Sequence, residues 1–165
     1  MLYDTSGGFF AARAWWMFRW VGHANVAVLN GGLSSWDGLS ESGKPTSPKK
    51  NDFRERKTLT KLVSLQELRS ASSYQMIDAR SVARWTGREE PIDKIGGHIP
   101  NALCYPFIEN LDQNNKFKST NLLANRFKNL KEPIIYYCGS GVTATHNILA
   151  MKIAGLAEPA LYAGS

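Results

Sequence analysis

A cysteine in a short glycine-containing loop is the residue of this sequence best placed to do chemistry. Cys138 follows the apolar run 133–137, which has the composition of a buried strand, and a helix is expected from Ala144 onward. The sulfur would then lie at a helix N-terminus, where the helix dipole and unpaired backbone N–H groups favour the nucleophilic thiolate. The rest of the loop is expected to contact a ligand: Gly139, Ser140, Gly141, Val142 and Thr143. The pattern therefore indicates nucleophilic sulfur chemistry.

Other interpretations of Cys138 are an inert packed thiol and a phosphatase nucleophile. Free cysteine is among the most buried residue types, so packing alone is a serious alternative. A cysteine-dependent phosphatase also places its cysteine loop before a helix, but it needs an arginine six positions later, where this chain has Ala144. The second cysteine, Cys104, lies in an expected strand and is interpreted as a packed, unreactive thiol.

Several motifs resemble those of the two-domain sulfurtransferases, the family of rhodanese and 3-mercaptopyruvate sulfurtransferase. Residues 137–144 are similar to the active-site loop of that family. Further matches follow in the family's order, namely 26–36, Asp78-Ala79-Arg80, Arg84-Trp85-Thr86-Gly87, Glu90-Pro91, 97–102 and 160–165. The resemblance implies an α/β fold: a rhodanese-like domain with a central, mostly parallel sheet flanked by helices, plus a remnant of a second such domain.

The resemblance implies transfer of sulfur from 3-mercaptopyruvate through a persulfide on Cys138, with no metal or organic cofactor. It also implies that Arg84 holds the carboxylate of this small anionic donor; without the resemblance, a surface ion pair explains Arg84 equally well. Members of the mercaptopyruvate type continue the Glu-Pro pair with another arginine, whereas Ile92 stands there in this chain. Arg88 is the candidate to replace it. The expected acceptor is a thiol or a thioredoxin-like protein.

Two alternatives to this function stay open. A thiosulfate-preferring rhodanese usually has basic residues directly after the cysteine, and the neutral Gly139 and Ser140 favour 3-mercaptopyruvate instead. A non-catalytic or weakly active sulfur-carrier module is the other alternative, because the resemblance implies that the front of the first domain and a short C-terminal tail are missing.

The chain contains one unit twice. Residues 2–7, an apolar helix over 9–21 and a strand over 26–29 parallel residues 136–141, a second helix and a strand over 160–162. Asp4 stands in the first copy where the second has Cys138, so only the second copy has a nucleophile. The expected organisation is a remnant of an inactive domain over 1–38, a basic linker over 39–61 and a catalytic domain over 62–165.

Strands alternate with helices in the second unit, which predicts a parallel sheet with ligands bound at the carboxyl ends of its strands. The expected elements are a helix over 65–71, a strand over 76–79, a helix over 121–130, a strand over 134–137 and a helix over 144–154. Ser64 and Glu67 resemble a capping box at the first of these helices. Asp78 and Arg80 are interpreted as a structural pair, and His98 as a turn residue.

The net charge of +6 comes largely from lysines and arginines of the linker, interspersed with proline and serine. This composition favours a solvated connector over a nucleic-acid surface. No apolar stretch reaches the length of a membrane span, and two separate cysteines suit a reducing cytoplasm. The helix over 9–21 is apolar all round, so we expect it to be covered on both sides, with a homodimer as one way to cover it.

Overall fold

Five short parallel strands form the central sheet of the computed structural model, which describes residues 1–44, 54–70 and 73–164. The strands lie in the order β1-β5-β4-β2-β3, and every pairing is parallel. Their bounds are β1 Leu62–Val63, β2 Gln75–Asp78, β3 Leu103–Cys104, β4 Ile134–Tyr137 and β5 Ala160–Tyr162. The predicted α/β class with a parallel sheet is confirmed.

Strand β4 is buried on both faces, which explains why its sequence is apolar at every position. Ile134 and Tyr136 belong to the larger core, which the sheet shares with α1, α4 and α5. Ile135 and Tyr137 belong to the smaller core on the opposite face. Because β4 is held from both sides, the residue that follows it, Cys138, has a fixed position.

The described residues also form five α-helices and two short 3-10 helices. They are α1 Phe9–Trp20, α2 Leu65–Ser70, α3 Val82–Trp85, α4 Thr120–Phe127, α5 Val142–Ile153, η1 Leu33–Ser35 and η2 Phe107–Asn110. The Ser64–Glu67 capping box at α2 is confirmed, since Ser64 N–H donates to Glu67 Oε2 and Glu67 N–H donates to Ser64 Oγ. The expected helix over 65–71 is described to Ser70, because residue 71 lies outside the described residues.

Two expected helix boundaries are wrong. Helix α5 begins at Val142, two residues before the expected start, because Gly141 adopts a left-handed conformation (φ 73°) and serves as the N-cap. Val142 and Thr143 are therefore the first turn of the helix and not part of the loop. Helix α4 ends at Phe127, three residues before the expected end, and a turn follows in which Leu130 N–H donates to Phe127 O.

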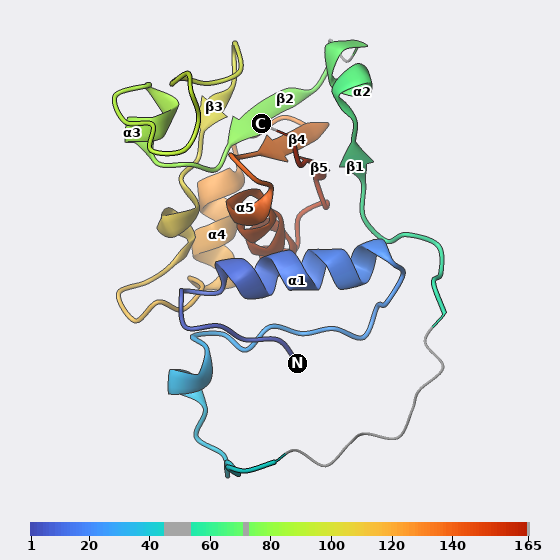
Figure 1. The fold of residues 1–165 in the computed structure, drawn as a ribbon, viewed down its shortest axis with the longest axis vertical. Helices are drawn as coiled ribbons and strands as arrows, with labels where there is room; N and C mark the ends of the chain where they lie inside the picture. The colour runs from blue at the N-terminus through green and yellow to red at the C-terminus, as the bar shows by residue number, and fades with distance from the viewer. Residues whose placement is uncertain (45–53, 71–72, 165) are drawn as a thin grey trace.

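The first segment of the chain packs against the second unit. Figure 1 shows three layers, in which α4 and α5 lie between the sheet and α1. One face of α1 is buried in the larger core and carries Ala12, Trp15 and Trp16, whose spacing places them on one side of a helix. Residues 1–38 thus share a core with the domain that holds Cys138. Part of the predicted linker, residues 45–53, lies outside the described residues.

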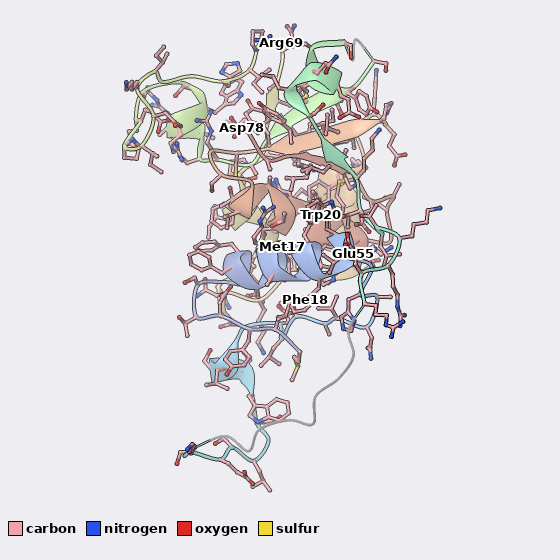
Figure 2. All side chains as sticks on the ribbon, turned by 45° about the vertical axis from the view of Figure 1, so that its right-hand side comes forward. Met17, Phe18, Trp20, Glu55, Arg69 and Asp78 are labelled. Atoms are coloured by element: carbon pink, nitrogen blue, oxygen red, sulfur yellow. The ribbon has the colours of Figure 1, made fainter. Side chains whose placement is uncertain are left out.

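The other side of α1 is exposed in this chain. Met17, Phe18 and Trp20 have 48%, 43% and 45% of their surface accessible, and Figure 2 shows them along the helix. The expectation that α1 is covered on both sides is therefore met on one side only.

Replacing Trp16 by alanine tests whether α1 is an integral layer of the fold. Trp16 is 1% exposed, so Trp16→Ala should lower the free energy of unfolding by about 3–5 kcal/mol, through lost burial and a cavity. Urea unfolding measures this value. The matched control is Met17→Ala on the exposed side of the same helix, expected to change it by about 0.5 kcal/mol or less. Equal, small effects of both variants would contradict the layer arrangement.

Candidate active site

Cys138 lies at the carboxyl end of β4, one short loop before α5. Its side chain is 3% exposed, and its Sγ accepts a hydrogen bond from Ser140 N–H at 3.5 Å. The loop is tight because Gly141 has a positive φ and because a Cβ on Gly141 would lie 3.2 Å from Ala163 Cβ. Only glycine meets both conditions without strain. The sequence therefore fixes the sulfur beneath a backbone amide at the start of a buried helix.

The first copy of the repeat shows that this type of loop holds an anion. The Asp4 carboxylate accepts hydrogen bonds from the backbone N–H groups of Ser6, Gly8 and Ala11 at 2.7, 2.8 and 2.8 Å. Gly8, the N-cap of α1, has φ 88° and ψ 3°, close to the φ 73° and ψ 4° of Gly141. Burial alone would raise the pKa of Asp4, but these hydrogen bonds together bring that pKa below its ordinary value.

The amide contacts of the two copies correspond. Ser6 N–H reaches the carboxylate of Asp4, two residues before it, and Ser140 N–H reaches the sulfur of Cys138, also two residues before it. In the second copy the atom held at this place is a potential nucleophile instead of a permanent anion. The geometry thus suits a sulfur that carries negative charge.

A cavity of about 440 Å³ opens onto Cys138. Tyr137 and Cys138 line it from β4 and the loop, and Arg80 lines it from the loop that follows β2. Residues 93–99 form the rest of its lining. The cavity lies at the carboxyl ends of the parallel strands, as the topology predicts. A small donor can therefore approach the sulfur from this side.

The structure places Arg84 beside the cysteine loop. A Cβ on Gly139 would lie 3.4 Å from Arg84 Nη2, so the guanidinium covers this residue of the loop. Arg84 also pairs with Glu90 at 2.6 Å and with Asp93 at 3.3 Å. Its hydrogen bond to Glu90 is the main cause that lowers the pKa of this carboxyl to about 2. Arg84 is thus held in place by two carboxylates that offset its charge.

Four other predicted site residues, Ser140, Val142, Thr143 and Arg88, differ in their burial and in their distance along the chain from Cys138. Ser140 is exposed, whereas Val142 and Thr143 are half-buried in the first turn of α5. Arg88 is exposed, donates from Nε to Thr86 Oγ1 at 3.1 Å and does not line the cavity described above. The structure therefore does not bring Arg88 to Cys138.

Cys138 is the one residue of this cavity lining that was predicted as a site residue, and two of the other lining residues, Lys94 and His98, have side chains that could act there. Lys94 lines the cavity two positions after Ile92 and brings a positive charge there. His98 also lines it, stacks on Trp85 with 4.1 Å between ring centroids and contacts Trp85 O through Nδ1 at 2.8 Å. The signal that could have found both is their place in the long loop after β2, at the carboxyl edge of the sheet.

The Asp78–Arg80 pair has the structural role predicted for it. Arg80 donates to Asp78 through Nε and Nη2, the latter at 2.7 Å, and to Gly97 O. Asp78 is fully buried. These bonds attach the loop around Gly97, and with it the wall of the cavity, to the end of β2.

Cys104 differs from Cys138 in its surroundings. It is half-buried, and its Sγ donates weakly to Arg80 O at 3.9 Å. Burial first, and then the nearby Asp78 carboxylate, raise the pKa of the Cys104 thiol to about 11. Both cysteines are free, and Cys104 remains a protonated thiol near neutral pH.

Metal-binding clusters and membrane-spanning helices are both absent from the described residues, 1–44, 54–70 and 73–164. This part of the chain has no cluster of three or more His, Cys, Asp or Glu side chains arranged to hold a metal ion. It also contains no helix with the length and apolar character needed to cross a membrane.

Residues 62–165 match the family described as rhodanese-like domain. This chain belongs to the rhodanese family. The matched region contains every strand of the sheet, the cavity and the Cys138 loop. The resemblance inferred from the motifs is therefore confirmed.

Some curated relatives of this rhodanese chain are named 3-mercaptopyruvate sulfurtransferase, and others are named thiosulfate sulfurtransferase. A probable 3-mercaptopyruvate sulfurtransferase of Pseudomonas aeruginosa is 39% identical over 176 residues, covering 100% of this chain and 62% of the relative. The human 3-mercaptopyruvate sulfurtransferase is 34% identical, covering 100% and 60%. The thiosulfate sulfurtransferase of Bos taurus is also 34% identical, covering 98% and 59%. The chain spans about three fifths of the length of these relatives.

Solved structures of the family superpose on the whole rhodanese chain. The crystal structure of SseA from Escherichia coli, described as a 3-mercaptopyruvate sulfotransferase, gives a TM-score of 0.81 at 35% identity, covering 99% of this chain and 64% of that one. Tum1 from Saccharomyces cerevisiae gives 0.85 at 27% identity, covering 99% and 63%. Both comparisons include residues 1–38, so the packing of α1 on α5 occurs within a known arrangement.

Thiol labelling tests the contrast between the two cysteines of the rhodanese chain. Iodoacetamide at pH 8 should modify Cys138 long before Cys104, because with a pKa of about 11 only roughly one Cys104 thiol in a thousand is ionised there. Peptide mapping after timed quenching gives the two rates. In denatured protein both residues should react at similar rates. Faster labelling of Cys104 in the folded protein would refute the assignment.

Proposed function

We propose that this chain is a sulfurtransferase that moves sulfur from 3-mercaptopyruvate to a thiol acceptor and carries it as the sulfane sulfur of a persulfide on Cys138. The observation that carries the proposal is the Cys138 loop, in which the Ser140 amide contacts the sulfur as the Ser6 amide contacts Asp4, and which opens onto a cavity of about 440 Å³. Relatives named 3-mercaptopyruvate sulfurtransferase support the donor.

The first half-reaction forms the persulfide. The Cys138 thiolate attacks the sulfur of the donor, a sulfur–sulfur bond forms, and the donor's carbon–sulfur bond breaks. The bonding electrons stay on carbon as the enolate of pyruvate, which takes the proton of the transferred thiol and leaves as pyruvate. Cys138 then carries an anionic persulfide. Splitting one transfer into two easier steps is the usual advantage of covalent catalysis.

The second half-reaction returns the enzyme to its first state. An acceptor thiolate attacks the outer sulfur of the persulfide, and the Cys138 thiolate leaves with the electrons of the sulfur–sulfur bond. The thiolate and the persulfide both carry negative charge, which the Ser140 amide and the N-terminus of α5 stabilise. A small thiol or a thioredoxin-like protein fits this role.

Charge at the cavity supports an anionic donor. Lys94 lines the cavity and offers a cation close to Ile92 in the sequence, and Arg84 lies beside the Cys138 loop, over Gly139, outside the residues that line the cavity. The residues directly after Cys138 are neutral, which favours a carboxylate donor over thiosulfate. Thiosulfate is the second candidate donor, because relatives at 34% identity carry the name thiosulfate sulfurtransferase.

The proposed chemistry also favours a reducing compartment. Cys138 must remain a free thiol between turnovers, and both cysteines of the chain are free. The cytoplasm maintains such thiols, whereas oxidising compartments favour disulfides. We therefore propose the cytoplasm as the place where the chain works.

Steady-state turnover of the two donors tests the proposal. We expect a higher kcat/KM with 3-mercaptopyruvate than with thiosulfate. Arg84→Ala should lower kcat/KM for 3-mercaptopyruvate by a factor that corresponds to about 2 kcal/mol or more of lost transition-state stabilisation. The reason is that the variant removes a partly buried guanidinium from the donor's carboxylate.

Arg69→Ala is the matched control, since Arg69 is an exposed arginine on α2 (Figure 2) and lies outside the cavity lining. It should leave both donors unaffected. Equal or better turnover of thiosulfate would move the assignment to the second candidate. No turnover of either donor would favour a non-catalytic sulfur carrier.

A further inference from the structure

Arg13 on helix α1 is a cation without a partner in the part of the chain that the structure describes. Its Nη1 atom is buried and makes no hydrogen bond there. The guanidinium lies 5.4 Å from the centroid of the Trp16 ring, which helps to hold it in place. A buried donor without a partner costs free energy, so its persistence calls for a ligand or a function.

The unpartnered atom points at the cysteine loop. A Cβ on Gly141 would lie 3.5 Å from Arg13 Nη1. Burial lowers the pKa of Arg13 from its ordinary value, and attraction to the Cys138 sulfur offsets part of that effect. The guanidinium nevertheless remains charged, because arginine does not deprotonate in proteins under ordinary conditions. Arg13 thus brings a positive charge to the loop from the first segment of the chain.

Because the chain contains one unit twice, the contact of Arg13 with the Cys138 loop has a counterpart, the contact of His146 with the Asp4 loop. Arg13 is the fifth residue of α1, and His146 is the fifth residue of α5. His146 Nε2 lies 3.1 Å from Gly7 O, in the loop that holds Asp4. Burial lowers the pKa of His146 to about 4, and Gly7 and Asp4 oppose that shift. In each copy, the fifth helical residue therefore reaches across to the loop of the other copy.

The two contacts between the copies differ in the loop that each side chain faces. His146 faces a loop whose anion, Asp4, is permanent and already satisfied by three amides. Arg13 faces a loop in which the structure shows one amide hydrogen bond to the Cys138 sulfur. The permanently charged Arg13 thus stands opposite the site where negative charge must form during a reaction, whereas His146, with a pKa of about 4, is neutral near pH 7.

Arg13 and Arg84 contribute differently to the loop. Arg84 approaches Gly139 and is paired with Glu90 and Asp93, so its charge is largely balanced. Arg13 approaches Gly141 at the other end of the loop and has no ion pair with the described carboxylates. Arg13 therefore places an unpaired positive charge beside this end of the Cys138 loop.

We propose that Arg13 stabilises the anion on Cys138 by donating a hydrogen bond from Nη1 to the charged sulfur, first the thiolate and then the persulfide. Residues 1–38 then supply one side chain to the active site. The persulfide part of this role rests on the proposed sulfur transfer, whereas the thiolate part does not.

Alkylation of Cys138 by two reagents of different charge tests the role of Arg13. The rates with anionic iodoacetate and neutral iodoacetamide are measured in a Cys104→Ser background without any sulfur donor. Both reagents need the same thiolate, so their rate ratio reports the local charge and not the amount of thiolate. Arg13→Met should lower the iodoacetate-to-iodoacetamide ratio by about five-fold, the effect of one unit charge at contact distance in water. Arg13→Lys should keep most of the ratio.

Two further variants make the outcome decisive. Arg13→Gln, which keeps a hydrogen-bond donor without the charge, should lower the ratio as methionine does and carries the test if the methionine variant does not fold. Arg19→Met, on the same helix, removes the arginine paired with Glu158 at 2.7 Å and should leave the ratio unchanged. Unchanged rates with both reagents in Arg13→Met and in Arg13→Gln would overturn the proposal, whereas a loss shared by both reagents reports less thiolate and supports it. Because no donor is present, failure of sulfur transfer would not affect this result.

Discussion

The burial of helix α5 on all sides is the constraint on which the rest of the structure depends. Residues 144–151 are buried without interruption, between the sheet and α4 on one side and α1 on the other. A helix covered in this way cannot shift without breaking the core. Its N-terminus therefore fixes the loop from Cys138 to Gly141, and the positions of the sulfur and of the Ser140 amide follow from core packing.

Duplication explains how the active site is divided between distant parts of the chain. Each copy supplies a tight loop and a helix, and the two helices pack against each other. The expected strand over 26–29 is wrong, because the structure has a single isolated bridge there, between Leu2 and Val28. In the first copy the loop holds the Asp4 carboxylate with three amides. In the second copy one of these contacts has a counterpart, from the Ser140 amide to the Cys138 sulfur. The inactive copy thus serves as a structural support, and through Arg13 it also reaches the loop of the active copy.

The sequence was sufficient to predict the features that local pattern determines. The apolar run before Cys138, the glycines after it and the alternation of strands with helices predicted the loop, the sheet and the family. The start of α5 was placed too late because β-branched Val142 and Thr143 resemble a loop or strand more than a helix. Contacts between distant segments were not predictable: the pairing of Arg84 with two carboxylates, and the approach of Arg13 to Gly141, depend on packing that no local pattern reveals.

Mass spectrometry can show whether Cys138 carries the transferred sulfur. After incubation with 3-mercaptopyruvate and removal of excess donor, the account predicts one added sulfur atom on the intact chain, located on the peptide that contains Cys138. The addition should disappear on treatment with a reducing thiol, be absent in Cys138→Ser and persist in Cys104→Ser. Sulfur found on Cys104, or on the Cys138→Ser variant, would contradict the account.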